Sequence, residues 1–282
     1  LSYIESPLFF CKGIFKMKNC LTIAGSDCSG GAGIQADLKA FSAMGTFGMS
    51  VVTAVVAENT SRVISIQDID INIVADQIDA VFEDIDVHAV KIGMLSDISI
   101  MKTVTQKITQ YRPEYVVVDP VMVATSGGVL LKSESVETLI NEIVPLAFLL
   151  TPNIPEAEIL SNMKISSLDD MKESAKIIYK QGAKNVLIKG GHFLGDATDI
   201  LFDGENFHTF SAKRVDTTST HGTGCTLSSA IASCLANGAD IVEAVKKSKD
   251  YLTNAISKAY GIGKGNGPVN HFYDYYDLRG VK

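Results

Sequence analysis

Short runs rich in β-branched residues alternate with amphipathic segments from Cys20 onwards, and this alternation constrains the fold more than any other feature. Parallel strands need a crossover of a dozen or more residues between them, which a helix usually supplies. Several apolar runs lack polar alternation, as expected for strands covered on both faces. The sequence therefore predicts an α/β fold with a mostly parallel central sheet and helices on both faces. The expected strands are 21–24, 50–57, 88–93, 115–119, 147–151 and 185–190, and the expected helices are 34–44, 72–84, 97–110, 133–143 and 168–181.

The rest of the chain continues the same domain. Asp203-Gly204 separates two short runs within 197–211, which predicts a β-hairpin. A helix is expected to end at Asn237-Gly238, and a second long helix to span 240–258. No internal repeat or Pro/Ser-rich linker interrupts the chain, so we expect one domain over 17–282. Residues 1–16 lack the charged start and cleavage signal of a secretory peptide, and we expect a native or artefactual extension ahead of a natural start at residue 17.

The charge balance of the 282-residue chain excludes several classes of protein. Its 25 Lys and Arg residues against 32 Asp and Glu residues give a net charge of −7, so no basic field exists to hold polyphosphate or anionic lipid. No run of about 18 apolar residues is present. We therefore expect no nucleic-acid and no membrane partner. The five cysteines form no CxxC pair, which favours a reducing cytoplasm over a disulfide framework or a zinc site.

A small-residue turn within 217–238 runs directly into a helix. Backbone N–H groups at a helix start lack intrahelical partners, so Gly222, Thr223 and Gly224 can bring amides to a phosphate oxygen. Cys225 falls in the first turn, where we expect the helix N-terminus to lower the pKa of its thiol and suit it to act as a base or polar contact. The alternative is a glycine turn that feeds an ordinary core helix.

A second glycine-rich turn, 25–33, follows the first strand. Its glycines permit close approach of a ligand to the backbone, but their spacing does not match a Rossmann dinucleotide site, and the chain has no Walker motif. Asp37 lies one turn into the next helix. Its carboxylate could accept hydrogen bonds from a small polar ligand, or merely complement the helix N-terminus.

Further chemically competent side chains follow other strands. Glu58 could accept a hydrogen bond from a ring amino group or be a solvated turn residue. Met94 could form an apolar wall for a flat ring or fill the core. Lys189 beside two glycines could steady polyphosphate or be solvated.

Asp119 and the pair Asn153 and Glu156 follow the fourth and fifth strands. Together they could hold hydrated Mg²⁺, which takes few direct carboxylates. Otherwise Asn153 caps a helix and Glu156 is its capping-box acid. Because parallel strands end at one edge of a sheet, we expect these groups to meet the amide-rich turn there. Amides, a cation, Mg²⁺ and a group near the accepting hydroxyl are what phosphoryl transfer needs.

Six segments taken together resemble the hydroxymethylpyrimidine/phosphomethylpyrimidine kinases of thiamine biosynthesis, which belong to the ribokinase superfamily. The segments are TIAGSDCSGGAGIQADLKAFSAMGTFGMSVVTAVVAENT (22–60), KIGML (91–95), VDPVM (118–122), TPNIPEAE (151–158), IKGGH (188–192) and THGTGCTLSSAIA (220–232). The resemblance implies a ribokinase-like fold, ATP and Mg²⁺ as cofactors, and a homodimer. It also implies two ATP-dependent steps, which phosphorylate 4-amino-5-hydroxymethyl-2-methylpyrimidine and then its monophosphate.

The resemblance also assigns roles to individual residues. Around the pyrimidine it places Gly25, Asp37, Glu58, Met94 and Val121. It assigns ATP binding to Asp119, Asn153, Lys189 and Thr220. It assigns metal binding to Glu156 and Asp119, and catalysis to Gly222, Thr223, Gly224 and Cys225. Sugar kinases of the superfamily usually carry an aspartate where Cys225 stands. The thiol therefore either accepts the substrate proton late or only positions the hydroxyl oxygen.

Two alternatives remain open at this stage. Kinases with the same sequence pattern act on pyridoxal, so a pyridoxal/pyridoxine kinase is the first. A catalytically silent pyrimidine or nucleotide sensor is the second. Many family members have glutamine where Glu58 stands, and a carboxyl group donates a hydrogen bond only when protonated. The paired glycines of 124–132 would also allow that segment to close as a lid.

Overall fold

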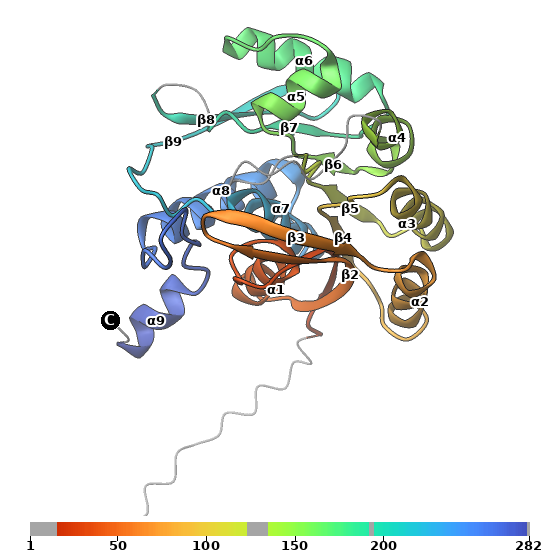
Figure 1. Cartoon of the computed structure of the whole chain (residues 1–282). Coiled ribbons are helices and arrows are strands. Elements are labelled where there is room, and N and C mark those ends of the chain that lie inside the picture. The colour runs from red at the N-terminus through yellow and green to blue at the C-terminus, as the bar shows by residue number, and fades with distance from the viewer. Residues whose placement is uncertain (1–15, 123–134, 192–194, 281–282) are drawn as a thin grey trace, which may run out of the picture.

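The computed structural model describes residues 16–122, 135–191 and 195–280. Within these residues the chain forms one nine-stranded sheet with strand order β3-β2-β1-β4-β5-β6-β7-β8-β9. Figure 1 shows helices on both sides of this sheet. The strands are β1 (Asn19–Asp27), β2 (Phe47–Asn59), β3 (Arg62–Asp68), β4 (Ala89–Ile92), β5 (Tyr115–Val118), β6 (Leu149–Leu150), β7 (Val186–Ile188), β8 (Ala197–Phe202) and β9 (Phe207–Ala212).

The six central strands, from β2 to β7 in the order of the sheet, run parallel. The strands at both edges, β3 on one side and the β8–β9 hairpin on the other, run antiparallel to their neighbours. The prediction of a mostly parallel sheet with helices on both faces is therefore confirmed. So is the hairpin, whose turn contains Gly204 at a φ of 97°.

The helices fall into two groups. The structure contains α1 (Gly33–Ala43), α2 (Ile71–Phe82), α3 (Ile98–Tyr111), α4 (Val136–Thr138), α5 (Ile154–Ser161), α6 (Leu168–Lys180), α7 (Thr223–Ala236), α8 (Ile241–Ser257) and α9 (Tyr273–Arg279). Helices α1, α7 and α8 cover one face of the sheet, whereas α2, α3, α5 and α6 cover the other. Acidic or hydroxyl side chains cap several helix starts, and Asp70, Asp97, Ser167 and Asp240 each accept a backbone N–H there.

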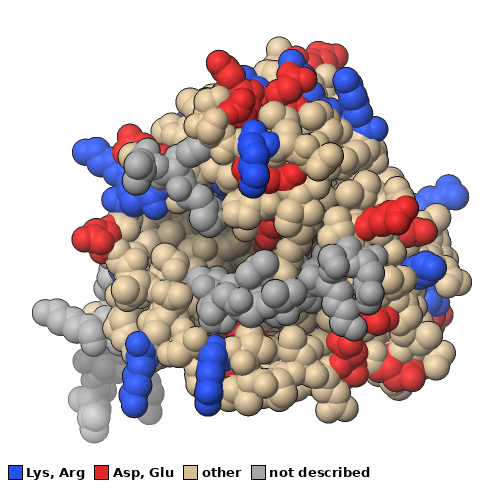
Figure 2. Space-filling model, turned by 45° about the horizontal axis from the view of Figure 1, so that its top comes forward, with Lys and Arg blue, Asp and Glu red and all other residues tan. Residues whose placement is uncertain are grey.

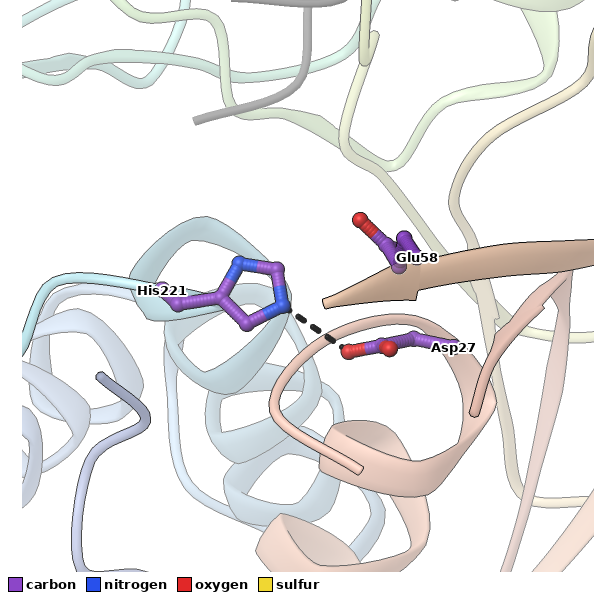
Figure 3. A group of neighbouring side chains, drawn as sticks. All are labelled: Asp27, Glu58 and His221. Carbon is purple, nitrogen blue, oxygen red and sulfur yellow. Dashed lines mark hydrogen bonds and ion pairs between the residues drawn. The ribbon is translucent and has the colours of Figure 1, made fainter. Parts of the chain in front are cut away.

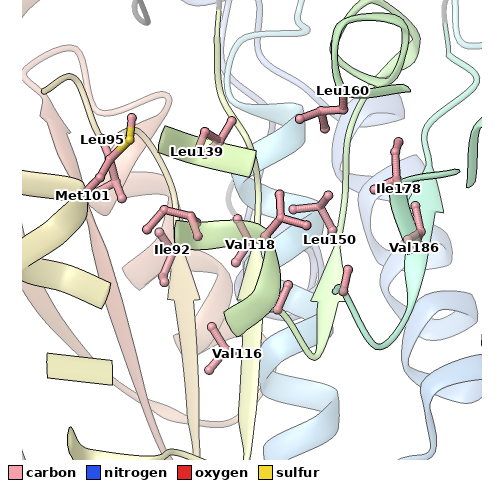
Figure 4. Packing of buried hydrophobic residues seen from close by; sticks show 14 of the residues in the cluster. Ile92, Leu95, Met101, Val116, Val118, Leu139, Leu150, Leu160, Ile178 and Val186 are labelled. Atoms are coloured by element: carbon pink, nitrogen blue, oxygen red, sulfur yellow. The ribbon is translucent and has the colours of Figure 1, made fainter. Parts of the chain in front are cut away.

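Two apolar layers hold the helices to the sheet because side chains alternate along each strand. In β5, Val116 and Val118 face the layer that contains α3, while Val117 faces α7. Figure 4 shows part of the first layer. Helix α7 is buried over most of its length, and small residues such as Ala230 and Ala232 let it pack closely against its neighbours. A helix enclosed in this way offers a rigid base for whatever its first turn binds.

The structure differs from the sequence prediction at several elements. Strand β3 was not expected, because its exposed residues show no buried face. The helix expected at 133–143 is only the short α4 followed by a π-helical turn, Leu139–Ile143, and residues 133 and 134 lie outside the described part. Helix α9 was also not expected. The extension 1–16, apart from its last residue, and the proposed lid 124–132 lie outside the described residues.

The parallel strands bring the polar loops to one edge of the sheet, because all six end on the same side. No helix among the described residues combines the length and the apolar character that crossing a bilayer requires.

Candidate active site

A cavity of about 690 Å³ opens at the carboxyl edge of the parallel strands. Figure 2 shows a hollow on this side of the molecule, with acidic and basic side chains interspersed around it. The cavity is lined by all the predicted site residues except Asp37, namely Gly25, Glu58, Met94, Asp119, Val121, Asn153, Glu156, Lys189, Thr220, Gly222, Thr223, Gly224 and Cys225. Residues from distant parts of the chain therefore share one wall.

The first turn of α7 lies at the base of this cavity. Gly222 is its N-cap with a φ of 75°, and a Cβ added there would overlap the carbonyl oxygen of Gly31. Only glycine combines this conformation with so close an approach of two backbones. The N–H groups of Gly224 and Cys225 follow in the first turn, where a helix supplies no acceptors. This arrangement suits an anion.

Cys225 differs from the sequence prediction in its protonation. Burial raises the pKa of its thiol to about 11, although nearby Lys91 acts to lower it. The expectation of a low pKa at the helix start is therefore wrong, because loss of solvent outweighs the helix N-terminus. The backbone N–H of Gly33 donates to the sulfur. At neutral pH the residue is a thiol that can donate a hydrogen bond.

A carboxylate and an ammonium group lie directly beside this turn. Lys189 Nζ is 2.7 Å from Asp119 Oδ1. A Cβ added at Gly224 would lie 3.0 Å from Asp119 Oδ2 and 3.3 Å from Lys189 Nζ. Burial acts to lower the pKa of Lys189, but Asp119 and Glu156 together raise it, so the ammonium stays charged. The site thus places a permanent cation next to the amides of α7.

Asn153 and Glu156 form the capping box of α5. The N–H of Asn153 donates to Glu156 Oε2 at 2.8 Å, and the N–H of Glu156 donates to Asn153 Oδ1 at 3.0 Å. The alternative reading of this pair as a capping box is therefore confirmed. Both residues also line the cavity. Burial raises the pKa of Glu156 to about 7, so a cation nearby would stabilise its ionised form.

Near the end of β1, apolar side chains form one part of the cavity wall, an apolar slot. A Cβ at Gly25 would lie 2.5 Å from Met94 Cε, so glycine leaves room for the methionine. Met94 packs with Ala54 and Val56, and Val121 lies against this group. Because Met94 and Val121 also face the cavity, they offer apolar walls to a flat ring.

Asp37 does not reach the cavity. Its side chain is fully buried, and Lys91 Nζ lies 2.9 Å from its Oδ2. The hydroxyls of Thr22 and Ser229 donate to the two oxygens at 2.6 and 2.7 Å. The structure corrects the expectation of a direct ligand contact, because this carboxylate is enclosed by protein donors beneath Cys225.

Sequence reasoning missed two residues of the cavity, Asp27 and His221. Asp27 ends β1 and His221 precedes α7, and His221 Nε2 lies 2.9 Å from Asp27 Oδ2. Figure 3 shows them beside Glu58, which extends from the end of β2. Asp27 lies in the segment 22–60 and His221 in the segment 220–232. A titratable side chain within a turn of small residues was the signal that could have identified both as site residues.

A further part of the wall is apolar and was also missed. It comes from helices α7 and α8 and from the segment after β9, and it consists of Val215, Leu227, Leu252 and Ile256, with Thr253 as a polar member. Two charged residues also line the cavity: Lys249 Nζ lies 2.6 Å from Asp199 Oδ2, and Asp199 Oδ1 accepts the N–H of Gly190 at 2.9 Å. This wall can receive a flat heterocycle. Its helical residues could not be found by motif because they follow ordinary helical periodicity, and Val215 lies in a segment without a motif.

The fold and this cavity define a ribokinase-like α/β protein. A family model described as phosphomethylpyrimidine kinase matches residues 27–270. The chain belongs to this family. A thiamine biosynthesis bifunctional protein, ThiED, of Geobacter sulfurreducens is 49% identical over 273 residues, which are 96% of this chain and 56% of that protein. A hydroxymethylpyrimidine/phosphomethylpyrimidine kinase of Rhizobium meliloti is 48% identical over 91% of this chain and 97% of its own length.

Solved structures agree with this assignment. A phosphomethylpyrimidine kinase from Clostridium difficile has a TM-score of 0.77 and 51% identity, and the match covers 85% of this chain and 99% of that one. A pyridoxal kinase from Staphylococcus aureus in complex with AMP-PCP and pyridoxal has a TM-score of 0.83 and 35% identity, over 90% of this chain and 94% of that one. The fold is thus shared by kinases of two heterocycles.

Replacing Gly222 with alanine tests the backbone contact at the start of α7. The substitution forces a left-handed φ on a residue with a side chain and drives a Cβ into Gly31, so we expect it to lower the free energy of unfolding by about 2 kcal/mol or more. Denaturant unfolding measures this loss.

Gly238→Ala is the matched control, because Gly238 has a φ of 91° but nothing within 4 Å of an added Cβ. It should cost about 1 kcal/mol from strain alone. Equal losses of unfolding free energy in the two variants would show that the close approach to Gly31 does not contribute to the cost of Gly222→Ala.

Proposed function

We propose that this chain uses ATP to phosphorylate the hydroxymethyl group of 4-amino-5-hydroxymethyl-2-methylpyrimidine, and then converts the monophosphate to the diphosphate, in thiamine biosynthesis. The observation that carries this proposal is the junction of Asp119, Lys189 and Gly224, which lies next to the apolar slot of Met94 and Val121. A phosphate site and a ring site therefore share one cavity. Membership of the family supports the same reaction.

ATP fits the larger part of the cavity. The apolar wall of Leu227, Leu252 and Ile256 offers a surface to the adenine base. Lys189 and the amides of Gly224 and Cys225 then neutralise and orient the phosphates, which is the main requirement of phosphoryl transfer. Asn153 and Thr220 also line the cavity. The AMP-PCP complex of the related pyridoxal kinase supports the use of ATP.

Asp119 and Glu156 fit Mg²⁺ that accompanies ATP. Asp119 uses Oδ1 for Lys189, while Oδ2 faces the start of α7. Glu156 is buried with a pKa near 7, so it lacks a full set of compensating charges. Oxygen ligands of this kind suit a small hard cation that keeps several waters. When bound, the ion would neutralise phosphate charge.

The substrate ring fits between Met94 and Val121, with Glu58 at one side. In this position the hydroxymethyl group faces the first turn of α7. Because Cys225 is a thiol at neutral pH, we infer that it positions the hydroxyl oxygen and does not start the reaction as a base. The substrate proton can leave late if the transition state is loose.

Pyridoxal is the competing substrate. Pyridoxal kinases from Staphylococcus aureus share the fold at 35–36% identity, whereas the phosphomethylpyrimidine kinase structure shares 51%. Glu58 also suits a ring with an exocyclic amino group. Both observations favour the pyrimidine.

We further propose that the protein works in the cytoplasm as a homodimer. The cysteines in the described part of the chain, Cys20, Cys28, Cys225 and Cys234, are free, as in a reducing compartment. Strand β3 is an exposed sheet edge, and Val55, Ile64 and Ile66 on β2 and β3 are 50%, 62% and 37% exposed. An edge strand with exposed apolar side chains is a ready surface for a second copy.

A two-substrate assay tests the reaction. Purified protein with ATP and Mg²⁺ should convert the pyrimidine to its monophosphate and then to the diphosphate, and kcat/KM should exceed that for pyridoxal by about tenfold or more, equivalent to roughly 1.4 kcal/mol in the transition state. Chromatography of the products measures both. Faster turnover of pyridoxal would favour the rival, and no turnover of either ring would favour the silent sensor.

Replacing Cys225 with alanine should lower kcat on the order of 100-fold, because the thiol is expected to orient the reacting oxygen. The KM for ATP should change little, since the amides of the turn remain. Cys225→Ser keeps a donor and should retain more activity than the alanine variant. An unchanged kcat in Cys225→Ala would make the thiol purely structural.

Light scattering after gel filtration tests the dimer. The wild-type chain should have twice its mass of 30.2 kDa. Ile64→Lys should yield monomers, because a charge on β3 opposes edge pairing. Ile73→Lys alters a residue of α2 that is 51% exposed and should leave the mass unchanged. A monomeric wild-type protein would refute this assembly.

A further inference from the structure

Three titratable side chains meet at the ring end of the cavity. Asp27, Glu58 and His221 come from the ends of β1 and β2 and from the turn before α7, and one ligand atom of each lies within 4.8 Å of the others. Figure 3 shows the imidazole directed at Asp27, with the Glu58 side chain across from them. None of the three is accounted for by the phosphate site.

The two carboxyl groups have opposite surroundings. Asp27 accepts hydrogen bonds from the N–H and hydroxyl of Ser29, from two further backbone amides at 2.9 and 2.7 Å, and from His221. Within the described part of the chain, no hydrogen bond reaches the side-chain carboxyl of Glu58. One carboxyl group is therefore stabilised as an anion, and its neighbour is not.

The charges follow from these surroundings. Burial alone would raise the pKa of Asp27, but the hydrogen bonds from His221, Ser29 and Ala32 bring it far below its usual range. Burial and the charge of Asp27 raise the pKa of Glu58 to about 7, while His221 acts to lower it. Asp27 is thus the fixed anion of the cluster, and Glu58 is the group that takes up a proton near neutral pH.

On the basis of the function proposed above, we propose that Glu58 meets the substrate as a neutral carboxylic acid. Its hydroxyl would donate to a ring nitrogen while its carbonyl oxygen accepts from the adjacent amino group. An ionised carboxylate has only acceptors and would set one of them against the nitrogen lone pair. Asp27 and His221 are then positioning residues that act through Glu58 by setting how readily it holds the proton.

The proton count of the complex follows directly. One proton lies between the carboxyl oxygen and the ring nitrogen, whichever of the two carried it before binding. Above the pKa of Glu58 neither partner holds it, so binding must take one proton from solvent. Glutamine at this position would present the same donor and acceptor at every pH, because its amide does not titrate.

The other ionisable groups around Glu58 are exposed. The turn after β1 contributes Cys28, whose thiol donates to the backbone oxygen of Glu58 at 3.1 Å. Strand β3 contributes Arg62, which pairs opposite Asn59, and the C-terminal tail contributes Lys264, whose N–H donates to Thr60. Both cations are exposed, so solvent screens them.

The pH dependence of KM for the pyrimidine tests the proposal. In the wild type, KM should rise about tenfold from pH 7.5 to 8.5, because the acid form falls tenfold per unit above its pKa. Glu58→Gln should show no such rise beyond the titration of the substrate, which both proteins share. KM for ATP should have the same pH profile in both proteins.

Glu83→Gln is the control for loss of a carboxylate. Glu83 is exposed at the C-terminal end of α2, at the edge of the sheet away from the cavity. The pH profile of KM in Glu83→Gln should match that of the wild type.

Calorimetry offers a second measurement. When the pyrimidine binds at pH 8.5 in two buffers of different ionisation enthalpy, the wild type should take up close to one proton more than Glu58→Gln.

Replacing His221 and replacing Asp27 should shift the pKa of Glu58 in opposite directions. His221→Gln removes a positive group and should move the midpoint of the KM profile to higher pH, whereas Asp27→Asn removes a negative one and should move it lower. A merely structural role would raise KM at all pH values without these shifts. If Asp27→Asn fails to fold, because Asp27 holds the 29–32 turn, His221→Gln decides the matter alone.

Coincident pH profiles of wild type and Glu58→Gln would overturn the inference, and so would an unshifted or lowered midpoint in His221→Gln. These outcomes are distinct from failure of the proposed function. If no phosphorylated pyrimidine forms at any pH, the reaction itself is wrong. If product forms but the wild-type profile is flat, only the protonation of Glu58 is refuted.

Discussion

The close approach of two backbone turns is the constraint on which the rest of this site depends. Gly222, at the start of α7, lies so near Gly31 that a Cβ added at Gly222 would overlap the carbonyl oxygen of Gly31. The contact brings the N-terminus of α1 beside the N-terminus of α7, and with them the ends of β1 and β2. Amides, thiol and carboxyl groups from opposite ends of the chain therefore face one cavity, and their relative positions follow from a backbone contact that flexible side chains cannot alter.

A buried ion pair holds together the elements that support the start of α7. Lys91 and Asp37 are both fully buried, and Thr22 and Ser229 complete the hydrogen bonds of the carboxylate. Taking two charges out of water offsets much of their attraction, so such a pair adds little net stability. Loss of either partner would leave an unpaired charge in the interior, at a cost of about 3–5 kcal/mol. The pair therefore joins β4, α1 and α7 in one arrangement behind Cys225 and contributes specificity more than stability.

The two ends of the cavity suit different tasks. Lys189 and the start of α7 provide positive charge and amides, as a triphosphate requires. The ring end contains Met94, Val121 and a carboxyl group that titrates near neutrality. In the function proposed above, separation of these environments would let one cavity orient a charged donor and a nearly neutral heterocycle, with the reacting hydroxyl between them. The shared fold of pyridoxal and pyrimidine kinases is consistent with a constant phosphate end and a variable ring end.

Local patterns determined much of this protein. Periodicity and helix caps predict the parallel strands, the hairpin and most helices, and the strand-end rule places thirteen of the fourteen predicted site residues on one cavity. Strand β3, the burial of Asp37, the Asp27–His221 pair and the raised pKa of Cys225 were not predicted. Each depends on neighbours distant in sequence. A residue's identity sets its intrinsic chemistry, but desolvation and pairing set its charge, and only the tertiary structure decides which groups exclude water from one another.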